Sequence, residues 1–157
     1  MWPPQGRAVN WIRKAGEKSG FTLIEVLIVI TVISTLATIV IPCAMSAQRK
    51  AKEANLRANL KQIRDAIETF EANTAGWPPA LSDVVAADGA SISADSDGRG
   101  ISVDRSAYDG PYLRTPDGNL PVDPFTGAAD WNYNNATGEV HSSSTLTALN
   151  GTAYTTW

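Results

Sequence analysis

Cysteine and histidine are almost missing from this sequence of 157 residues: Cys43 is the only cysteine and His141 the only histidine. One cysteine excludes a disulfide within the chain and a metal site built on cysteines. Cys43 is therefore interpreted either as a small apolar side chain packed in the interior or as half of a disulfide between subunits. A lone histidine, without Ser-His-Asp spacing or a phosphate-binding glycine loop, gives no basis for catalysis, so we expect no enzyme.

Basic residues are scarce in the C-terminal half of the chain. After Ala75 there are three arginines and ten acidic residues, a formal net charge of −7. Residues 1–20 contain four basic residues and one acidic residue, a formal net charge of +3. A basic start and an acidic end indicate a membrane between them, and we expect no nucleic acid as a partner.

Long hydrophobic runs are also rare, and residues 21–41 form the one that is present, with Glu25 as its only charge. A helix of this length rises ~31 Å, which matches the hydrocarbon core of a bilayer. The basic residues before it predict a cytoplasmic N-terminus and a periplasmic C-terminal part, in a single pass through a bacterial inner membrane. The run is too long for an ordinary secretory signal, and Pro42 before Cys43 does not suit a lipoprotein signal.

Glu25 is the unusual residue of this run. A carboxylate in the middle of a bilayer costs about 2.5–3.5 kcal/mol on insertion scales and is functional by default. If the chain keeps its first 20 residues, Glu25 can reach water at the interface. If the chain is cut after Gly20, the new α-amine of Phe21 in a neighbouring subunit can pair with Glu25, and each charge then offsets the desolvation of the other.

Residues 18–26, KSGFTLIEV, carry a family resemblance. After their short basic leader they resemble the class III signal of type IV prepilins and type II secretion pseudopilins. The resemblance implies that a prepilin peptidase cleaves between Gly20 and Phe21 and methylates the Phe21 amine. It also implies that Glu25 sets the register of subunits in a filament. Pro42 lies where many of these proteins have a helix-softening proline, so we expect a kink there.

An amphipathic pattern follows the hydrophobic run without a break. Its apolar side chains recur at helical spacing in a small stripe (Ala44, Ala47, Ala51, Ala54 and Ala58) and a bulky stripe (Leu56, Leu60, Ile63, Ile67 and Phe70). We predict one helix over residues 21–75, some ~80 Å long, that spans the membrane at about 21–41. Three pairs of opposite charge at a spacing of four predict ion pairs: Arg49–Glu53, Lys61–Asp65 and Arg64–Glu68.

Residues 76–157 are rich in glycine, proline, aspartate and serine, which predicts a loop-rich β head. Short strands are expected at 112–113, 131–133, 139–141 and 154–157, with a hairpin loop at 134–138 and an exposed loop at 86–100. The expected core aromatics are Trp77, Trp131, Tyr133, Tyr154 and Trp157. The expected fold class is therefore α+β and pilin-like. The second half of one long N-terminal helix packs against a small antiparallel sheet, after a cleaved leader over residues 1–20.

Metal binding has weak support. Residues 95–100, DSDGRG, faintly resemble a calcium loop with Asp95 and Asp97 as candidates, but Arg99 takes a ligand position. Residues 110–133 resemble the head of the major pseudopilin, whose late loop commonly supplies acidic calcium ligands, whereas residues 141–157 contain no acid. We expect no cofactor, and a solvated loop is favoured over calcium at residues 95–100.

The resemblance implies a structural subunit of a type II secretion pseudopilus, which polymerises through its N-terminal helix to drive protein export across the outer membrane. The implied partners are further copies of the chain in a helical filament, the prepilin peptidase, an inner-membrane assembly platform and minor pseudopilins. The single cysteine favours a pseudopilin, because pilus subunits usually close their C-terminal region with a cysteine pair. Two alternatives stay open: a major or minor pilin of a type IV pilus, for adhesion, motility or DNA uptake, and a signal-anchored periplasmic enzyme or binding domain.

Overall fold

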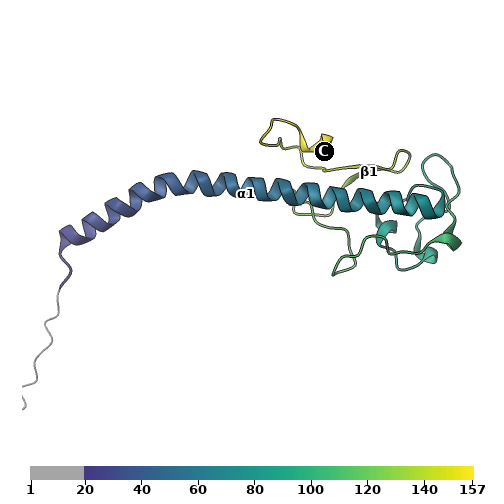
Figure 1. Ribbon diagram of the computed structural model, residues 1–157, viewed down its shortest axis with the longest axis horizontal. Helices are drawn as coiled ribbons and strands as arrows, with labels where there is room; N and C mark the ends of the chain where they lie inside the picture. The colour runs from purple at the N-terminus through teal and green to yellow at the C-terminus, as the bar shows by residue number, and fades with distance from the viewer. Residues whose placement is uncertain (1–19) are drawn as a thin grey trace, which may run out of the picture. The chain divides into compact units, whose positions relative to one another are not determined.

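The computed structural model describes residues 20–157, and helix α1 (Leu23–Thr74) is its main element (Figure 1). The predicted leader lies outside the described residues except for Gly20. α1 has 52 residues and includes Pro42, so the predicted single helix over 21–75 is confirmed within two residues at each end. The chain divides into two compact units between Pro42 and Cys43, and each is described by itself below.

In the first unit, α1 is mostly apolar, and Glu25 is its only charged residue. An 18-residue window of α1 has a mean hydropathy of 2.6, which makes the helix long and apolar enough to cross a membrane by length and composition. The hydroxyl groups of Thr31, Ser34, Thr35 and Thr38 donate hydrogen bonds of 2.6–3.0 Å to carbonyls three or four residues earlier. These bonds satisfy the hydroxyl donors within the helix, as an apolar surrounding requires.

The second unit, residues 43–157, is called the head unit here, and its core lies along α1. The predicted bulky stripe is confirmed, since each of its five side chains is at most 1% exposed. The rest of the chain covers this stripe with seven buried hydrophobic residues: Leu81, Val84, Leu113, Trp131, Val140, Ala148 and Tyr154. A second cluster joins Phe70 to Ile92 and Val103. The small stripe of alanines, in contrast, is exposed.

α1 ends at Thr74 in a left-handed turn. Ala75 has a φ of 67°, a conformation that usually belongs to glycine after a helix. Its N–H still donates a 2.9 Å hydrogen bond to the carbonyl of Glu71. Pro78 and Pro79 follow shortly and cannot continue the helix.

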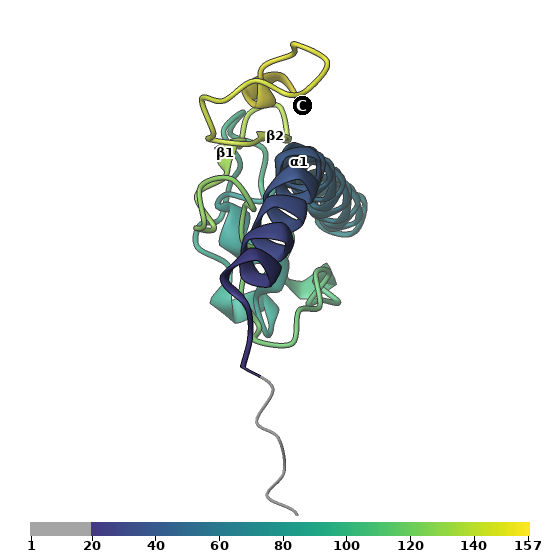
Figure 2. The same ribbon diagram turned by 90° about the vertical axis from the view of Figure 1, so that its left-hand side faces the viewer.

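The sheet of the head unit is a single antiparallel hairpin of β1 (Asn132–Asn134) and β2 (Glu139–His141). Tyr133 pairs with Val140, whose side chain is fully buried in the core. Figure 2 shows the two strands side by side. The predicted strands at 131–133 and 139–141 and the α+β fold class are thus confirmed, with β1 displaced by one residue.

Two predicted strands are wrong. The N–H groups of Tyr112 and Leu113 both donate 3.0 Å hydrogen bonds to the carbonyl of Val84, in the 3-10 helix η1 (Leu81–Val85), so no strand forms there. The C-terminal residues form the 3-10 helix η4 (Tyr154–Thr156) because they bind side chains of α1 instead of a strand.

Three expectations about burial also need correction. Cys43 is exposed in this chain, so the interior position is wrong. The segment 86–100 is not wholly exposed, because Ile92 and Asp97 are buried. Of the five aromatics assigned to the core, Trp131 and Tyr154 are buried, while the other three are half-buried against it.

Candidate processing and assembly site

Gly20 and Phe21, the two sides of the predicted cleavage, are exposed and precede α1. Phe21 is 79% exposed. A Cβ built on Gly20 would meet nothing within 4 Å among the described residues, so packing there does not require a glycine. An accessible bond outside regular structure is what a peptidase needs.

Thr22 caps the start of α1, a role that the sequence reasoning missed. Its Oγ1 accepts a 3.3 Å hydrogen bond from the N–H of Glu25, and its carbonyl accepts a 3.1 Å bond from the same group. Threonine followed three residues later by glutamate is the sequence signature of a helix N-terminus, so the signal was available. Glu25 also lies in the first turn, where the helix dipole favours a negative charge.

The carboxylate of Glu25 projects from an otherwise apolar helix and is exposed. Within residues 20–157, no ion pair or hydrogen bond reaches this carboxylate, whereas the nearby hydroxyl groups all bond to their own helix. A cation for Glu25 therefore has to come from outside the described part of this chain.

Pro42 lies inside α1, and the helix continues through it. Proline has no N–H to offer the carbonyl of Thr38, so one backbone hydrogen bond of the helix is missing here. The expected kink stays a prediction.

In the head unit, Glu53 fastens the C-terminal segment to α1. It is 8% exposed, and Oε1 accepts 2.8 Å hydrogen bonds from the N–H of Leu149 and the hydroxyl of Tyr154. Burial raises the pKa of Glu53, but these bonds and the charges of Arg49 and Arg57 outweigh it, so the pKa lies below its usual value. The predicted Arg49–Glu53 ion pair is wrong. Glu53 lies three residues before Leu56 and therefore on the same buried face of α1. The helical spacing could thus have indicated that Glu53 is buried.

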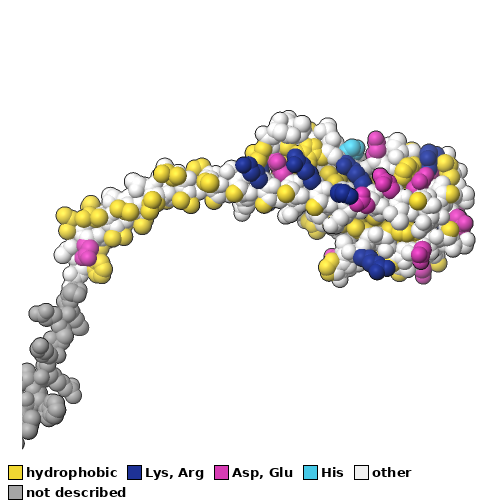
Figure 3. Space-filling view, in the orientation of Figure 1, with side chains coloured by type: hydrophobic (Ala, Val, Ile, Leu, Met, Phe, Trp, Pro, Cys, Tyr) yellow, Lys and Arg dark blue, Asp and Glu magenta, His cyan; other side chains and the backbone are white. Residues whose placement is uncertain are grey.

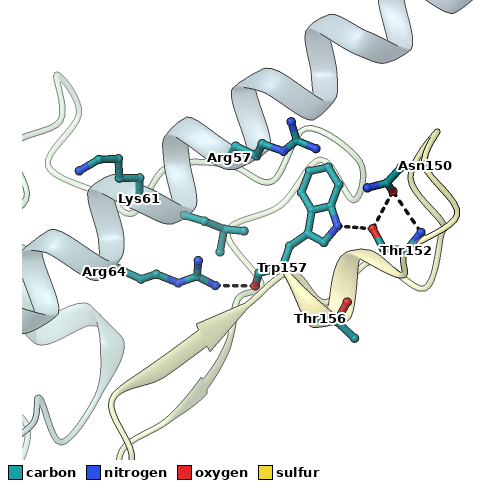
Figure 4. A pocket seen from close by; sticks show the side chains of 8 residues that line it. Arg57, Lys61, Arg64, Asn150, Thr152, Thr156 and Trp157 are labelled. Carbon is teal, nitrogen blue, oxygen red and sulfur yellow. Dashed lines mark hydrogen bonds between the residues drawn. The ribbon is translucent and has the colours of Figure 1, made fainter.

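A surface hollow of about 410 Å³ lies between α1 and the end of the chain (Figure 4). The guanidinium of Arg57 lies 4.3 Å from the ring centroid of Trp157, and Nη2 of Arg64 donates to the carbonyl of Trp157 at 2.5 Å. Nδ1 of His141 lies 2.8 Å from the same carbonyl oxygen. These side chains hold Trp157 against the helix. Since Arg64 bonds to carbonyls, the predicted Arg64–Glu68 pair is wrong, whereas Lys61 and Asp65 form theirs at 2.6 Å.

The calcium candidates are both paired with arginines. Asp97 is buried and accepts hydrogen bonds of 2.7–3.3 Å from Arg99, Ile101 and Trp77, the last in the segment that follows α1. Burial raises the pKa of Asp97, but these bonds lower it to about 2. Asp95 pairs with Arg105 at 2.9 Å. In the part of the chain that the structure describes, no three acidic, histidine or cysteine side chains gather as metal ligands would.

The N-terminal motif has a counterpart among known families. The family model described as the prokaryotic N-terminal methylation motif matches residues 17–41, which include Gly20, Phe21 and Glu25. Three curated relatives are each named type II secretion system core protein G. The one from Pseudomonas aeruginosa is 32% identical over 62 residues. Those from Aeromonas hydrophila and Escherichia coli are both 27% identical, over 108 and 67 residues.

Residues 17–41 thus match the N-terminal methylation motif, and the chain is similar to core proteins G of type II secretion systems. The match with the Pseudomonas protein covers 40% of this chain and 44% of that protein. The match with the Aeromonas protein covers 69% of this chain and 68% of that protein. The match with the Escherichia protein covers 43% of this chain and 46% of that protein. The matched part of the chain therefore spans less than half the length of two of these relatives. No solved structure matches the chain significantly.

Proposed function

We propose that this chain is a structural, non-enzymatic subunit of a type II secretion pseudopilus. In this proposal a prepilin peptidase removes residues 1–20 and methylates the amine of Phe21. The subunit then waits in the bacterial inner membrane, with its head in the periplasm. An assembly platform and minor pseudopilins then help it to polymerise into a periplasmic filament that drives protein export across the outer membrane.

One observation carries the proposal: an exposed carboxylate lies near the start of a membrane-length helix, directly after an accessible Gly20–Phe21 bond. Cleavage at that bond creates a cation in the same apolar layer. In a bundle of such helices, the amine of one subunit can neutralise Glu25 of the next, which is cheaper than leaving either charge alone. The names of the three relatives favour secretion over a pilus.

Intact-mass measurement of the protein isolated from its own membranes tests processing. The expected mass lacks residues 1–20 and includes one added methyl group. Gly20→Leu should remain at full length in the membrane fraction. A native protein that starts at Met1 contradicts the proposal.

Loss of the gene tests the role in secretion. Export of secreted proteins should stop and return when the wild-type gene is restored. Loss of surface adhesion or motility with unchanged export would assign the chain to a type IV pilus instead.

A further inference from the structure

The head unit carries a surface groove of about 300 Å³, called the Leu146 groove here. It is lined by Met45, Gln48, Arg49, Lys52, Phe125 and Leu146. Met45 is 66% exposed and Leu146 is 53% exposed, so two large apolar side chains face solvent at one place. Such clustered exposure is typical of a surface that another molecule covers.

The loop that carries Leu146 is held in place on α1. The guanidinium of Arg49 donates to the carbonyl of Thr147, and Glu53 accepts the N–H of Leu149 at 2.8 Å. The carbonyl of Leu146 itself accepts a 3.1 Å hydrogen bond from the N–H of Tyr154. The backbone around Leu146 is thus fixed in the head unit, so a partner that covers this side chain does not have to order the loop first.

The Leu146 groove is basic. Residues 43–64 contain six basic residues and one acidic residue, and the acidic one, Glu53, is buried. Nζ of Lys52 lies 5.9 Å from the ring centroid of Phe125, at the groove itself. Within residues 20–157, no salt bridge joins Lys50 or Lys52 to an acid of the same chain. These two cations are therefore available to an acidic partner.

The opposite charge gathers in residues 86–109, called the acidic loop here, which contain five acidic and two basic residues. Hydrogen bonds from serine hydroxyls lower the pKa values of Asp88 and Asp104, so both carboxylates stay charged. Ile101 adds an apolar side chain that is 39% exposed. The exposed acids of the loop are Asp88, Asp95, Asp104 and Asp109.

The two surfaces lie at opposite ends of the head unit along α1. Lys52 lines the Leu146 groove, whereas the N–H of Asp104 donates a 2.9 Å hydrogen bond to the carbonyl of Thr74, the last residue of α1. Lys52 and Thr74 are 22 positions apart, which corresponds to about 33 Å of helix rise. Figure 3 shows Lys and Arg side chains mainly along the first part of α1 in the head unit, and Asp and Glu side chains mainly toward the end of α1.

This separation determines how two parallel copies can meet. The groove of one copy reaches the acidic loop of the other only when the two copies are shifted along α1. Each such contact leaves one groove and one acidic loop free for further copies. The contact is therefore heterologous, and its repetition produces an open chain of subunits.

We propose that the Leu146 groove of one subunit binds the acidic loop of a second copy, shifted by about 33 Å along α1. Ile101 of the second copy packs against Leu146, and its Asp104 lies beside Lys50 and Lys52. This inference rests on the proposed polymerisation and adds a contact between heads to the bundle of N-terminal helices. A second copy is favoured over lipid or another protein because the chain itself carries a surface of opposite charge with an exposed apolar side chain.

Charge reversal tests the contact in filaments sheared from cells. Lys52→Glu and Asp104→Lys should each lower the filament yield about two- to fivefold, since an exposed ion pair contributes modestly. Both changes in one chain should restore the yield, because every contact then joins opposite charges again. Arg114→Glu is the matched control, since Arg114 is exposed outside both surfaces, and it should keep the yield. A double variant no better than the single ones contradicts the pairing.

Disulfide cross-linking tests the geometry, in a Cys43→Ser background. After oxidation in membranes, the full chain with both Leu146→Cys and Ile101→Cys should form a ladder of oligomers. Either change alone should leave monomers. The two positions lie at opposite ends of the head unit, too far apart for a disulfide within one chain. Leu146→Cys with Asn119→Cys is the control and should leave monomers, because Asn119 is exposed outside the acidic loop.

Three cross-linking results would overturn the inference. Normal filaments in which the double-cysteine chain stays monomeric assign the groove to lipid or to another protein. Dimers from Leu146→Cys alone indicate a contact between two grooves. A ladder that stops at dimers indicates a closed antiparallel pair. The proposed function fails separately: a full ladder in cells that never form filaments supports this contact and contradicts the pseudopilus.

Discussion

The hydroxyl of Tyr154 donates a 2.8 Å hydrogen bond to Oε1 of Glu53, although the two residues are 101 positions apart in sequence. The tyrosine ring is fully buried and stacks on Phe125, with ring centroids 4.2 Å apart. The C-terminal segment contains no acidic residue, so the carboxylate that organises it comes from α1.

Removal of this carboxylate should loosen the C-terminal segment. Glu53→Ala leaves the N–H of Leu149 and the buried hydroxyl of Tyr154 without their acceptor. We expect a loss of about 1–3 kcal/mol in the free energy of unfolding, because a buried polar group that lacks a partner costs that much. Urea denaturation of the full chain in detergent measures the loss.

The matched control is Glu68→Ala, an exposed glutamate on the same helix, which should change the free energy of unfolding by less than about 0.5 kcal/mol. Tyr154→Phe combined with Glu53→Ala should cost less than the sum of the single changes, since both remove one hydrogen bond. Strict additivity would contradict the coupling of the two residues.

The head should lose stability in acid through Asp97. Its pKa lies at about 2, compared with an ordinary value of 3.8, because hydrogen bonds from Ile101 and Arg99 outweigh its burial. A carboxylate with a lowered pKa in the folded state stabilises the fold above its unfolded pKa and loses that contribution as the pH falls. The free energy of unfolding should therefore fall between pH 3.8 and about 2.

The comparison variant for this pH dependence is Asp97→Asn, measured by urea denaturation at a series of pH values. It should be less stable than the wild type at pH 7, and its stability should fall less steeply over the same interval. Equal slopes for the two proteins would show that another acid is responsible.

Ala75→Gly should stabilise the head unit. Ala75 has a φ of 67°, and the left-handed conformation costs a residue with a Cβ roughly 1 kcal/mol relative to glycine. Ala72→Gly, three residues earlier inside α1, should instead destabilise by about 1 kcal/mol. Thermal melts of both variants check the opposite signs, and destabilisation by both would contradict the strain at Ala75.

The sequence predicted the parts of the fold that follow from periodicity. The apolar run, the bulky stripe from Leu56 to Phe70 and the hairpin at β1 and β2 each have a regular pattern that local rules detect. The strand predicted at 154–157 failed because its backbone bonds depend on contacts with α1 that are distant in sequence. The spacing of opposite charges likewise predicted an ion pair between Arg49 and Glu53. Glu53 is instead buried, and its carboxylate accepts hydrogen bonds from Leu149 and Tyr154.

The sequence predicted the N-terminal motif of the candidate site well, but it did not predict the contacts of the head unit with α1. Gly20, Phe21 and Glu25 form a short contiguous motif, so their proximity is given by the chain itself. The cap by Thr22 has an equally local signature. The bonds of Glu53 with Leu149 and Tyr154, in contrast, join residues 96 and 101 positions apart, and no spacing rule brings such distant positions together.

Glu25 has two separable roles, and its substitutions can distinguish them. As the third residue of the first turn of α1, it stabilises the start of the helix next to Thr22. As a carboxylate, it can pair with the amine of a neighbouring subunit. Glu25→Gln keeps a side chain that can cap but removes the charge, whereas Glu25→Asp keeps the charge on a shorter side chain.

If the charge matters, Glu25→Gln should be cleaved and inserted like the wild type but should assemble into few filaments, while Glu25→Asp should retain part of the yield. Filaments sheared or sedimented from cells that also express wild-type subunits measure this, with cleavage followed by intact mass. Thr22→Ala is the control for the cap: it weakens the helix start by about 1 kcal/mol and leaves the charge in place, so assembly should continue. Equal loss of filaments in Thr22→Ala and Glu25→Gln would mean that Glu25 acts through the helix start alone. Normal yield from Glu25→Gln would eliminate the ion pair between subunits.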